Sequence, residues 1–259
     1  MKTVIVGYGE IGKAFGKLMD RRGITYSTVD IDKEVIRDGD QHDIMLVNIP
    51  FSDKFHEQVV AYHKRFKPSL IIINSTVAVG TTKALNGAIE DGDVVHSPVR
   101  GIHPNLVGGL IAFTKQIGYD ENKISAELTK DFFRKIGITN TSIVEGSKNT
   151  ELAKLISTTT YGVQIAWATE VNKICEEFGC DYDTVYTDSN KIYNEGYELL
   201  QKPQYKKPLL KPNKGGIGGH CVVSNAIILA KALPLRKSLI DSIIDLSVDA
   251  LVGDVKPDE

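Results

Sequence analysis

A glycine-rich turn near the amino terminus constrains the fold of this chain more than any other sequence feature. Gly7-Tyr8-Gly9-Glu10-Ile11-Gly12 follows the β-branched run Thr3–Val6 directly and opens the amphipathic stretch Ile11–Arg22. In this order, the first glycine allows a tight turn, the second lets a pyrophosphate approach the backbone, and the third lets the helix pack closely on the strand. The amide groups at the helix start then face the anion. The turn therefore predicts a dinucleotide-binding βαβ unit.

An acidic residue at the end of the next apolar run indicates which dinucleotide is bound. Asp30 follows Thr25–Val29, at a place where a carboxylate can accept hydrogen bonds from the ribose hydroxyls. A carboxylate there repels a 2′-phosphate, so we predict NAD rather than NADP, although Lys33 and Arg37 lie nearby in the sequence. A glycine turn followed by a merely solvated aspartate is the alternative. The predicted cofactor contacts are Gly7, Gly9, Glu10, Ile11, Gly12, Asp30 and Thr76.

The first half of the chain alternates short β-branched runs with amphipathic stretches. This pattern is typical of a parallel sheet covered by helices on both faces. The expected strands are Thr3–Val6, Thr25–Val29, Ile44–Ile49, Leu70–Asn74, Asp93–His96 and Thr114–Ile117. The expected helices are Ile11–Arg22, Lys54–Phe66, Thr82–Ile89 and Ser125–Ile136.

The pattern changes after this half. From Asn149 to Phe178 apolar residues recur at helical spacing without a proline, and Gly179 supplies a stop, which predicts one long helix. Shorter helical segments are expected at Asp183–Asn190, Ala226–Ala232 and Arg236–Val252. The predicted fold class is α/β: a Rossmann-type doubly wound parallel sheet over residues 1–145, then a smaller all-α domain over residues 146–259. The long helix connects the two, or packs against its copy in a dimer.

Composition excludes several classes of protein. The 259 residues carry 31 Lys+Arg against 33 Asp+Glu, so no broad basic surface is available for nucleic acid. No apolar run approaches the roughly 18 residues of a membrane span, and the first residues do not read as a signal peptide. Three cysteines cannot all pair, which fits a reducing compartment, and the six histidines lack metal-ligand spacing. We expect a cytoplasmic protein without a metal, nucleic-acid or membrane partner.

Two segments leave expected strands at the edge of the sheet where ligands bind. The segment after Leu70–Asn74 carries Thr76, which could face the nicotinamide or a bound water, or could simply form a hydroxyl-capped turn. The segment after Asp93–His96 offers Arg100 and His103 to an anionic or hydroxylated substrate. A surface salt bridge for Arg100 and a solvated His103 stay equally open.

Polar residues on the long helix share one face. Glu151, Lys154 and Thr158 lie at helical spacing, and a lysine near an active site can stabilise an oxyanion or exchange a proton. An exposed Glu151–Lys154 pair on a solvated face is favoured by these residues alone.

A second glycine-rich segment ends in a thiol. The glycines of residues 215–219 permit close approach of the backbone to a ligand, and Cys221 follows them at an expected helix start, a setting that suits a nucleophile. The alternative is a small buried apolar residue, the class to which we assign Cys175 and Cys180.

Taken together, the chain resembles the nucleotide-sugar 6-dehydrogenases, the UDP-glucose/GDP-mannose dehydrogenase family. The resemblance rests on four collinear features: Gly7–Gly12 with Asp30, Ser75-Thr76-Val77 with Gly80-Thr81-Thr82, the helical segment Glu151–Leu155, and Gly218-Gly219-His220-Cys221. It implies an NAD-dependent, four-electron oxidation of a sugar C6 alcohol to a carboxylate. Cys221 would capture the aldehyde as a thiohemiacetal and then carry the thioester, Lys154 would stabilise the oxyanions, and Thr76 would position water. Gly218, Gly219, Arg100 and His103 would contact the sugar or nucleotide sugar, and a homodimer along the long helix is expected.

The chain also departs from the family pattern. Thr158 stands where the family has asparagine, and Asn225 stands where it has aspartate, so Asn225 cannot act as a carboxylate base. His103 is a candidate acid/base in place of the family's glutamate-bearing loop. The sequence ends at Glu259, before the further domain that grips the nucleotide, so we expect another chain to hold the nucleotide, or a smaller substrate, or a missing carboxyl-terminal part. The alternatives are a two-electron β-hydroxyacid-type dehydrogenase that uses Lys154 as acid/base, and a catalytically silent NAD-binding subunit.

Overall fold

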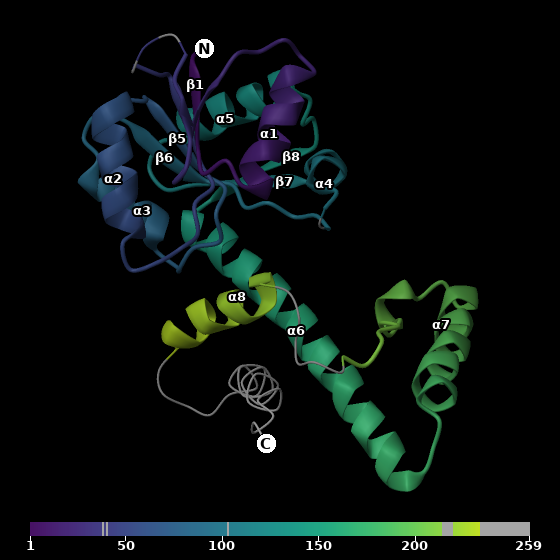
Figure 1. Ribbon diagram of the computed structural model, residues 1–259. Helices are drawn as coiled ribbons and strands as arrows, with labels where there is room; N and C mark the ends of the chain where they lie inside the picture. The colour runs from purple at the N-terminus through teal and green to yellow at the C-terminus, as the bar shows by residue number, and fades with distance from the viewer. Residues whose placement is uncertain (38, 40, 103, 214–219, 234–259) are drawn as a thin grey trace. The chain divides into compact units, whose positions relative to one another are not determined.

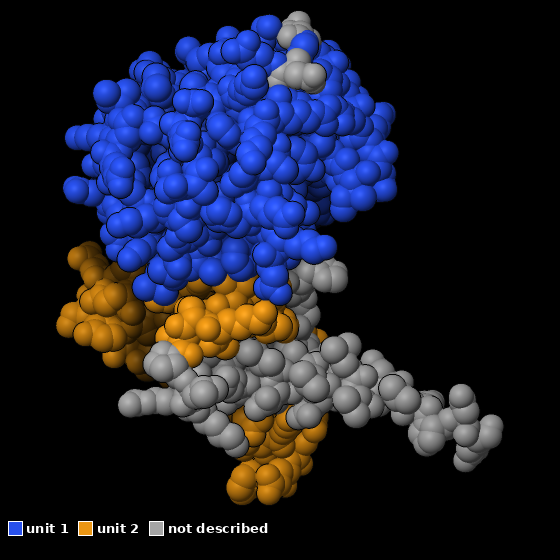
Figure 2. All heavy atoms as spheres, turned by 90° about the vertical axis from the view of Figure 1, so that its left-hand side faces the viewer, with its two compact units in different colours: residues 1–154 blue, residues 155–259 orange. Residues whose placement is uncertain are grey.

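The computed structural model describes residues 1–37, 39, 41–102, 104–213 and 220–233. The chain divides into two compact units, Met1–Lys154 and Leu155–Glu259, which Figure 2 shows in different colours. The domain division that we predict at residue 145 stays a prediction. In the described part of the chain no helix is both long enough and apolar enough to cross a membrane.

The first unit is built on a mixed sheet of eight strands in the order β3-β2-β1-β4-β5-β6-β7-β8 (Figure 1). The strands are β1 (Thr3–Val6), β2 (Ser27–Val29), β3 (Glu34–Val35), β4 (Ile44–Val47), β5 (Leu70–Ile73), β6 (Asp93–His96), β7 (Lys115–Tyr119) and β8 (Thr141–Glu145). All pairings are parallel except β2 with β3 and β6 with β7. The predicted fold class is therefore confirmed, with the correction that the sheet is not wholly parallel.

Helices cover both faces of this sheet, because successive strand residues point to opposite sides. The helices of the first unit are α1 (Glu10–Asp20), α2 (Phe55–Phe66), α3 (Thr81–Ala88), α4 (Leu106–Ala112) and α5 (Lys123–Ile136). Ile5 and Ile72 face a core shared with α1, α4 and α5, whereas Val4 and Ile71 face a core shared with α2 and α3. Figure 1 shows α2 and α3 on the side of the sheet opposite α1 and α4. This two-sided burial is why the strands read as continuous apolar runs.

Three elements of the first unit were not expected from the sequence. β3 has only two residues and β8 lies at the sheet edge, so neither shows a clear apolar pattern. α4 contains Gly108 and Gly109, which weaken a helical pattern. A Cβ at Gly109 would lie 2.6 Å from the Arg100 carbonyl oxygen, so the glycine is needed for close packing of α4 on the segment after β6.

The long helix α6 (Ser147–Phe178) begins in the first unit and continues into the second. The second unit adds a π-helical turn (Asp183–Asp188), α7 (Ser189–Leu199), a short 3-10 helix (Pro203–Tyr205) and α8 (His220–Lys231). Val222 and Ala226 of α8 pack against Val163 and Ala166 of α6.

Two tyrosines fix the segment that precedes the glycine-rich stretch. The Tyr182 and Tyr186 hydroxyls donate hydrogen bonds to the Leu210 and Pro208 carbonyls at 2.9 and 3.0 Å, respectively. The predicted helix Arg236–Val252 lies outside the described residues.

Candidate active site

The glycine turn has the geometry that a pyrophosphate site requires. Gly7 has φ +83°, and a Cβ there would lie 2.8 Å from the carbonyl carbon of Asn48. A Cβ at Gly12 would lie 2.1 Å from the Gly7 oxygen. Around Gly9, by contrast, no atom lies within 4 Å of the Cβ position. Gly9 caps α1, whose first turn starts at Glu10 and Ile11, so open space adjoins a helix N-terminus and fits a dinucleotide phosphate.

Asp30 is tied to this turn by its carboxylate. One oxygen accepts the Tyr8 amide at 2.5 Å, and the other accepts the Ile31 amide at 2.7 Å. Because a carboxylate has about four acceptor positions, these two bonds leave capacity for ribose hydroxyls. A cavity of about 600 Å³ adjoins Tyr8 and Asp30, and Lys33 and Arg37 also line it.

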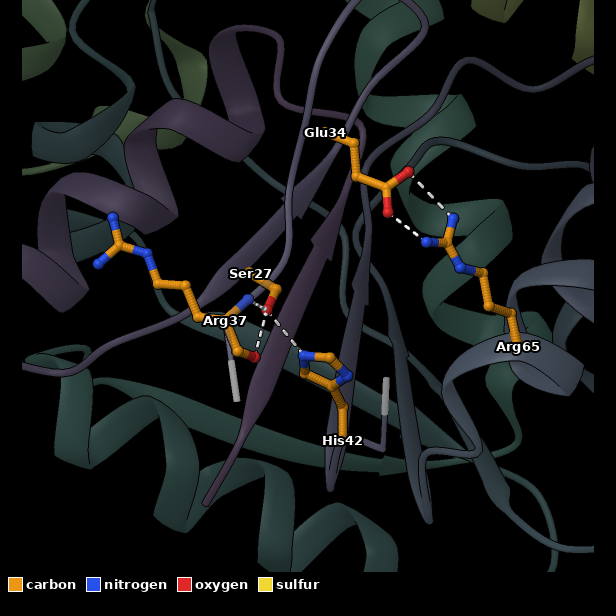
Figure 3. A network of polar contacts seen from close by, with 5 residues as sticks. All are labelled: Ser27, Glu34, Arg37, His42 and Arg65. Carbon is orange, nitrogen blue, oxygen red and sulfur yellow. Dashed lines mark hydrogen bonds and ion pairs between the residues drawn. The ribbon is translucent and has the colours of Figure 1, made fainter. Parts of the chain in front are cut away.

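The segment that carries these cations is fixed to the sheet (Figure 3). The Ser27 hydroxyl donates to the Arg37 carbonyl at 3.0 Å and accepts its amide at 2.8 Å, and buried His42 reaches the same hydroxyl at 2.9 Å. Glu34 of β3 forms a bidentate ion pair with Arg65 of α2. The Arg37 guanidinium extends away from Ser27 and His42 in Figure 3. The anchored cations Lys33 and Arg37 thus line one cavity with Asp30, and the balance of these charges is the feature from which we predict NAD rather than NADP.

Replacing Asp30 with alanine tests this balance. We expect NAD affinity to fall by about tenfold or more, because hydrogen bonds to a charged acceptor contribute roughly 1.5–3 kcal/mol. The affinity for NADP should rise relative to that for NAD, since the repulsion of a 2′-phosphate is removed. Isothermal titration with both cofactors measures this, and Asp32→Ala is the matched control, because Asp32 lines the same cavity. Unchanged NAD affinity in Asp30→Ala would refute the ribose contact.

The first turn of α6 holds one end of the segment that carries Thr76. Glu151 is fully buried, and its carboxylate accepts the Gly80 amide at 2.6 Å, the Thr82 amide at 2.8 Å and the Thr82 hydroxyl at 2.7 Å. Burial raises the pKa of Glu151, and the bonds from Thr82 and Gly80 oppose that rise. The exposed position expected for Glu151 is therefore wrong: its buried carboxylate binds the start of α3, a partner 69 residues away that helical spacing cannot reveal.

A buried histidine holds the other end of this segment. His96 lies with one ring nitrogen 3.2 Å from the Ser75 carbonyl and the other 2.8 Å from the Thr150 hydroxyl. A carbonyl only accepts, so we assign the proton to Nε2. Thr150 and Glu151 thus fix both ends of residues 75–82, and half-buried Thr76 lies between them. Lys154 follows Thr150 by one helical turn and so shares its face of α6.

Burial lowers the pKa of His96 to about 3, and the charges of Lys115 and Lys154 add to this effect. The unfolded chain, with a histidine pKa of about 6.5, therefore binds more protons than the folded chain between these two values. The contribution of His96 to the free energy of unfolding is therefore fully present above pH 6.5 and is lost progressively as the pH falls from 6.5 toward 3. From pH 7 to pH 5 this residue should reduce the free energy of unfolding by about 2 kcal/mol.

Urea unfolding at the two pH values checks this prediction. His96→Gln should lose less stability on acidification than the parent chain, whereas His56→Gln, at an exposed position, should behave like the parent. Equal acid sensitivity of the parent chain and His96→Gln would contradict it.

The second unit carries the thiol and its neighbours. Cys221 is the second residue of α8 and is exposed, and Asn225 follows one turn later and is buried. Thr158 is half-buried on α6.

The other two cysteines differ in exposure. Cys175 is buried as expected, but Cys180 is exposed, so its assignment to the buried class is wrong. His103, Gly218 and Gly219 lie outside the described residues, and the meeting of Cys221 with Lys154 stays a prediction.

Sequence reasoning missed the buried lysine of the first unit. Lys115 starts β7 and is 3% exposed, and its pKa is lowered well below the usual value by burial, then by the charges of Lys154 and Arg100. Arg100 and Lys154 therefore act on the same buried ammonium. The sequence gives little signal for this role, because the strand reads Lys115-Gln116-Ile117-Gly118-Tyr119 and carries a second polar residue. Among the described residues no cluster of three or more His, Cys, Asp or Glu side chains could hold a metal.

Comparisons with known proteins find sequence relatives among the nucleotide-sugar dehydrogenases. No protein-family model matches the chain. UDP-N-acetyl-D-mannosamine dehydrogenase of Methanocaldococcus jannaschii is 31% identical over 157 residues, which is 60% of this chain and 33% of the relative. NDP-N-acetyl-D-galactosaminuronic acid dehydrogenase of Ralstonia nicotianae is 24% identical over 204 residues, 73% of this chain and 43% of the relative. The chain spans about a third of the length of the first of these relatives.

Solved structures share the fold. UDP-D-ManNAc dehydrogenase from Pyrococcus horikoshii superposes with a TM-score of 0.74 at 18% identity, covering 98% of this chain and 69% of that one. Mycobacterium tuberculosis 3-hydroxyisobutyrate dehydrogenase gives a TM-score of 0.70 at 14% identity, covering 98% and 94%. At these identities the likeness shows the fold alone. The chain thus has a Rossmann-type fold, and its homologues in sequence, over about 60% of its length, are nucleotide-sugar dehydrogenases.

Proposed function

We propose that the protein is an NAD-dependent dehydrogenase that oxidises the C6 alcohol of a nucleotide sugar to a carboxylate. The observation that carries this proposal is the pair of half-sites at the carboxyl edge of the sheet. The glycine turn and Asp30 follow β1 and β2, and the doubly anchored Thr76 segment follows β5. The strand order reverses between β1 and β4, and dinucleotides bind at such a switch point.

Within this proposal each residue has a defined task. When bound, NAD supplies the hydride acceptor, and two equivalents are consumed. Lys154 stabilises the alkoxide that forms when the C6 hydroxyl loses its proton to solvent, and later the oxyanion of the thiohemiacetal, and each oxyanion then expels its hydride. The Cys221 thiolate adds to the aldehyde carbon and forms a thiohemiacetal, and loss of the second hydride leaves a thioester. Water, positioned by Thr76, cleaves the carbon–sulfur bond, which releases the carboxylate and returns the thiol.

One observation favours a second candidate function. Asn225, one turn after Cys221, carries an amide and cannot take a proton from the hydrolytic water. A two-electron oxidation of a β-hydroxyacid, with Lys154 as acid/base and Cys221 as a bystander, needs no such base.

A thermal-shift screen of the whole chain separates these functions, because a ligand that binds only the native state raises its melting temperature. The probes are NAD, UDP-N-acetylhexosamines, GDP-mannose and 3-hydroxyisobutyrate, alone and with NAD. The proposal predicts stabilisation by NAD and by a nucleotide sugar. Stabilisation by the hydroxyacid alone would favour the second function, and no response to NAD would refute both.

A further inference from the structure

Lys115 reaches both segments that leave the sheet at the candidate site. Because β7 is antiparallel to β6, the first residue of β7 lies beside the carboxyl end of β6. The Lys115 Nζ donates to the Asn74 Oδ1 at 3.1 Å, to the Pro98 carbonyl at 3.3 Å and to the Ser97 carbonyl. An ammonium has three N–H donors, so these acceptors match it completely.

The surroundings of Lys115 offset little of the free-energy cost of burying its charged side chain. Its Nζ lies 5.6 Å from the ring centre of Phe15 and 5.1 Å from that of Phe133, contacts that stabilise a cation only modestly. The side chain is 3% exposed, and in the described part of the chain it forms no ion pair with a carboxylate. The charges that act on it most, those of Lys154 and Arg100, are also positive. A methionine or leucine would fill this space without that electrostatic cost.

The three acceptors link Lys115 to the candidate site. Asn74 directly precedes Ser75 and Thr76, and Ser97 and Pro98 lead to Arg100. One ammonium thus joins the backbone after β5 to the backbone after β6. The three acceptor oxygens around Nζ favour the protonated amine, whereas burial and the charges of Lys154 and Arg100 lower its pKa. A positive charge held in such a water-excluded position stabilises negative charge that develops nearby in a transition state.

We propose that Lys115 is a positioning residue of the candidate active site, which holds the Thr76 and Arg100 segments together and, as the protonated amine that its three acceptors match, places a positive charge behind them. The charge adds to that of Lys154 when an oxyanion forms on the substrate. This proposal rests on the proposed function, but its tethering half can be measured without any substrate.

The experiment compares variants of the whole chain. Lys115→Met removes tether and charge, and Lys115→Gln keeps donors for the carbonyls but no charge. Phe15→Leu loosens the packing around Lys115 and leaves its amine in place. Hydrogen–deuterium exchange of peptides covering residues 74–82 and 96–101 reports the tether, and NAD titration with steady-state kinetics on a UDP-N-acetylhexosamine reports the charge.

We expect exchange in these peptides to be at least about tenfold faster in Lys115→Met and near parental in Lys115→Gln. In both variants kcat should fall at least about tenfold, with KM and NAD affinity within about threefold. Phe15→Leu should lower the melting temperature and leave kcat within about threefold. If Lys115→Met does not fold, Lys115→Gln alone decides the charge.

Parental exchange in Lys115→Met, or parental kcat in both lysine variants, would overturn the proposal, and so would an equal loss of kcat in Phe15→Leu. If the parent chain forms no NADH with any nucleotide sugar, the proposed function fails, and the exchange measurement still decides whether Lys115 tethers the two segments.

Discussion

Replacing Cys221 with serine should reduce the complete oxidation of the sugar by about 10³-fold or more, the scale on which enzymes slow when a covalent nucleophile is lost. A serine hydroxyl is scarcely ionised at neutral pH, so it does not capture the aldehyde as a thiolate does. The second hydride is then not transferred. NAD affinity should stay within about twofold, because the predicted cofactor contacts lie in the first unit.

Cys180→Ser is the matched control for this prediction, since Cys180 is also exposed in the second unit. Its turnover should equal that of the parent chain. Both variants are assayed for NADH formation and for the carboxylate product. Full turnover in Cys221→Ser would remove the covalent mechanism and leave the two-electron alternative.

Replacing Glu151 with alanine should lower the free energy of unfolding by about 3 kcal/mol, because three donors, the Gly80 and Thr82 amides and the Thr82 hydroxyl, lose their acceptor. Relief of the burial that raises the pKa of this carboxyl offsets part of the loss. Activity should also fall, since the segment that carries Thr76 is no longer held at its α3 end. Urea unfolding and NADH formation measure the two effects.

Two further variants separate the hydrogen bonds from general effects. Glu151→Gln keeps the side-chain volume but replaces one acceptor oxygen with a donor, so its stability should lie between those of Glu151→Ala and the parent chain. Glu127→Ala, on the exposed surface of α5, should change stability by less than about 0.5 kcal/mol. A loss of stability in Glu127→Ala as large as that in Glu151→Ala would contradict the stabilising role assigned to the Glu151 hydrogen bonds.

The sequence predicted those parts of the fold in which local pattern and tertiary role agree. The strand, glycine turn and helix of residues 3–20 were recognisable because Gly7 and Gly12 meet steric demands within that unit and Gly9 leaves open space at the helix start. The central strands were recognisable because both of their faces are buried. β3 could not be recognised, since two residues show no alternation, and α4 was hidden by the glycines that its packing needs.

The candidate site was predictable only where a motif stays contiguous in the chain. Asp30 and Thr76 could be named from their places at strand ends. The partners of Glu151, His96 and Lys115 lie 69, 54 and 41 residues away, at Thr82, Thr150 and Asn74, and no spacing rule links such pairs. Glu151 therefore looked like a solvated surface residue, and Lys115 was not considered.

The central claim, a four-electron oxidation that passes through Cys221, is tested most directly by stoichiometry. With the whole chain, excess NAD and a limiting amount of the UDP-N-acetylhexosamine that the thermal-shift screen selects, NADH is followed by absorbance to its end point. We expect two NADH formed per sugar consumed, with the carboxylate as the product. One NADH per sugar, with an aldehyde as the product, would contradict it.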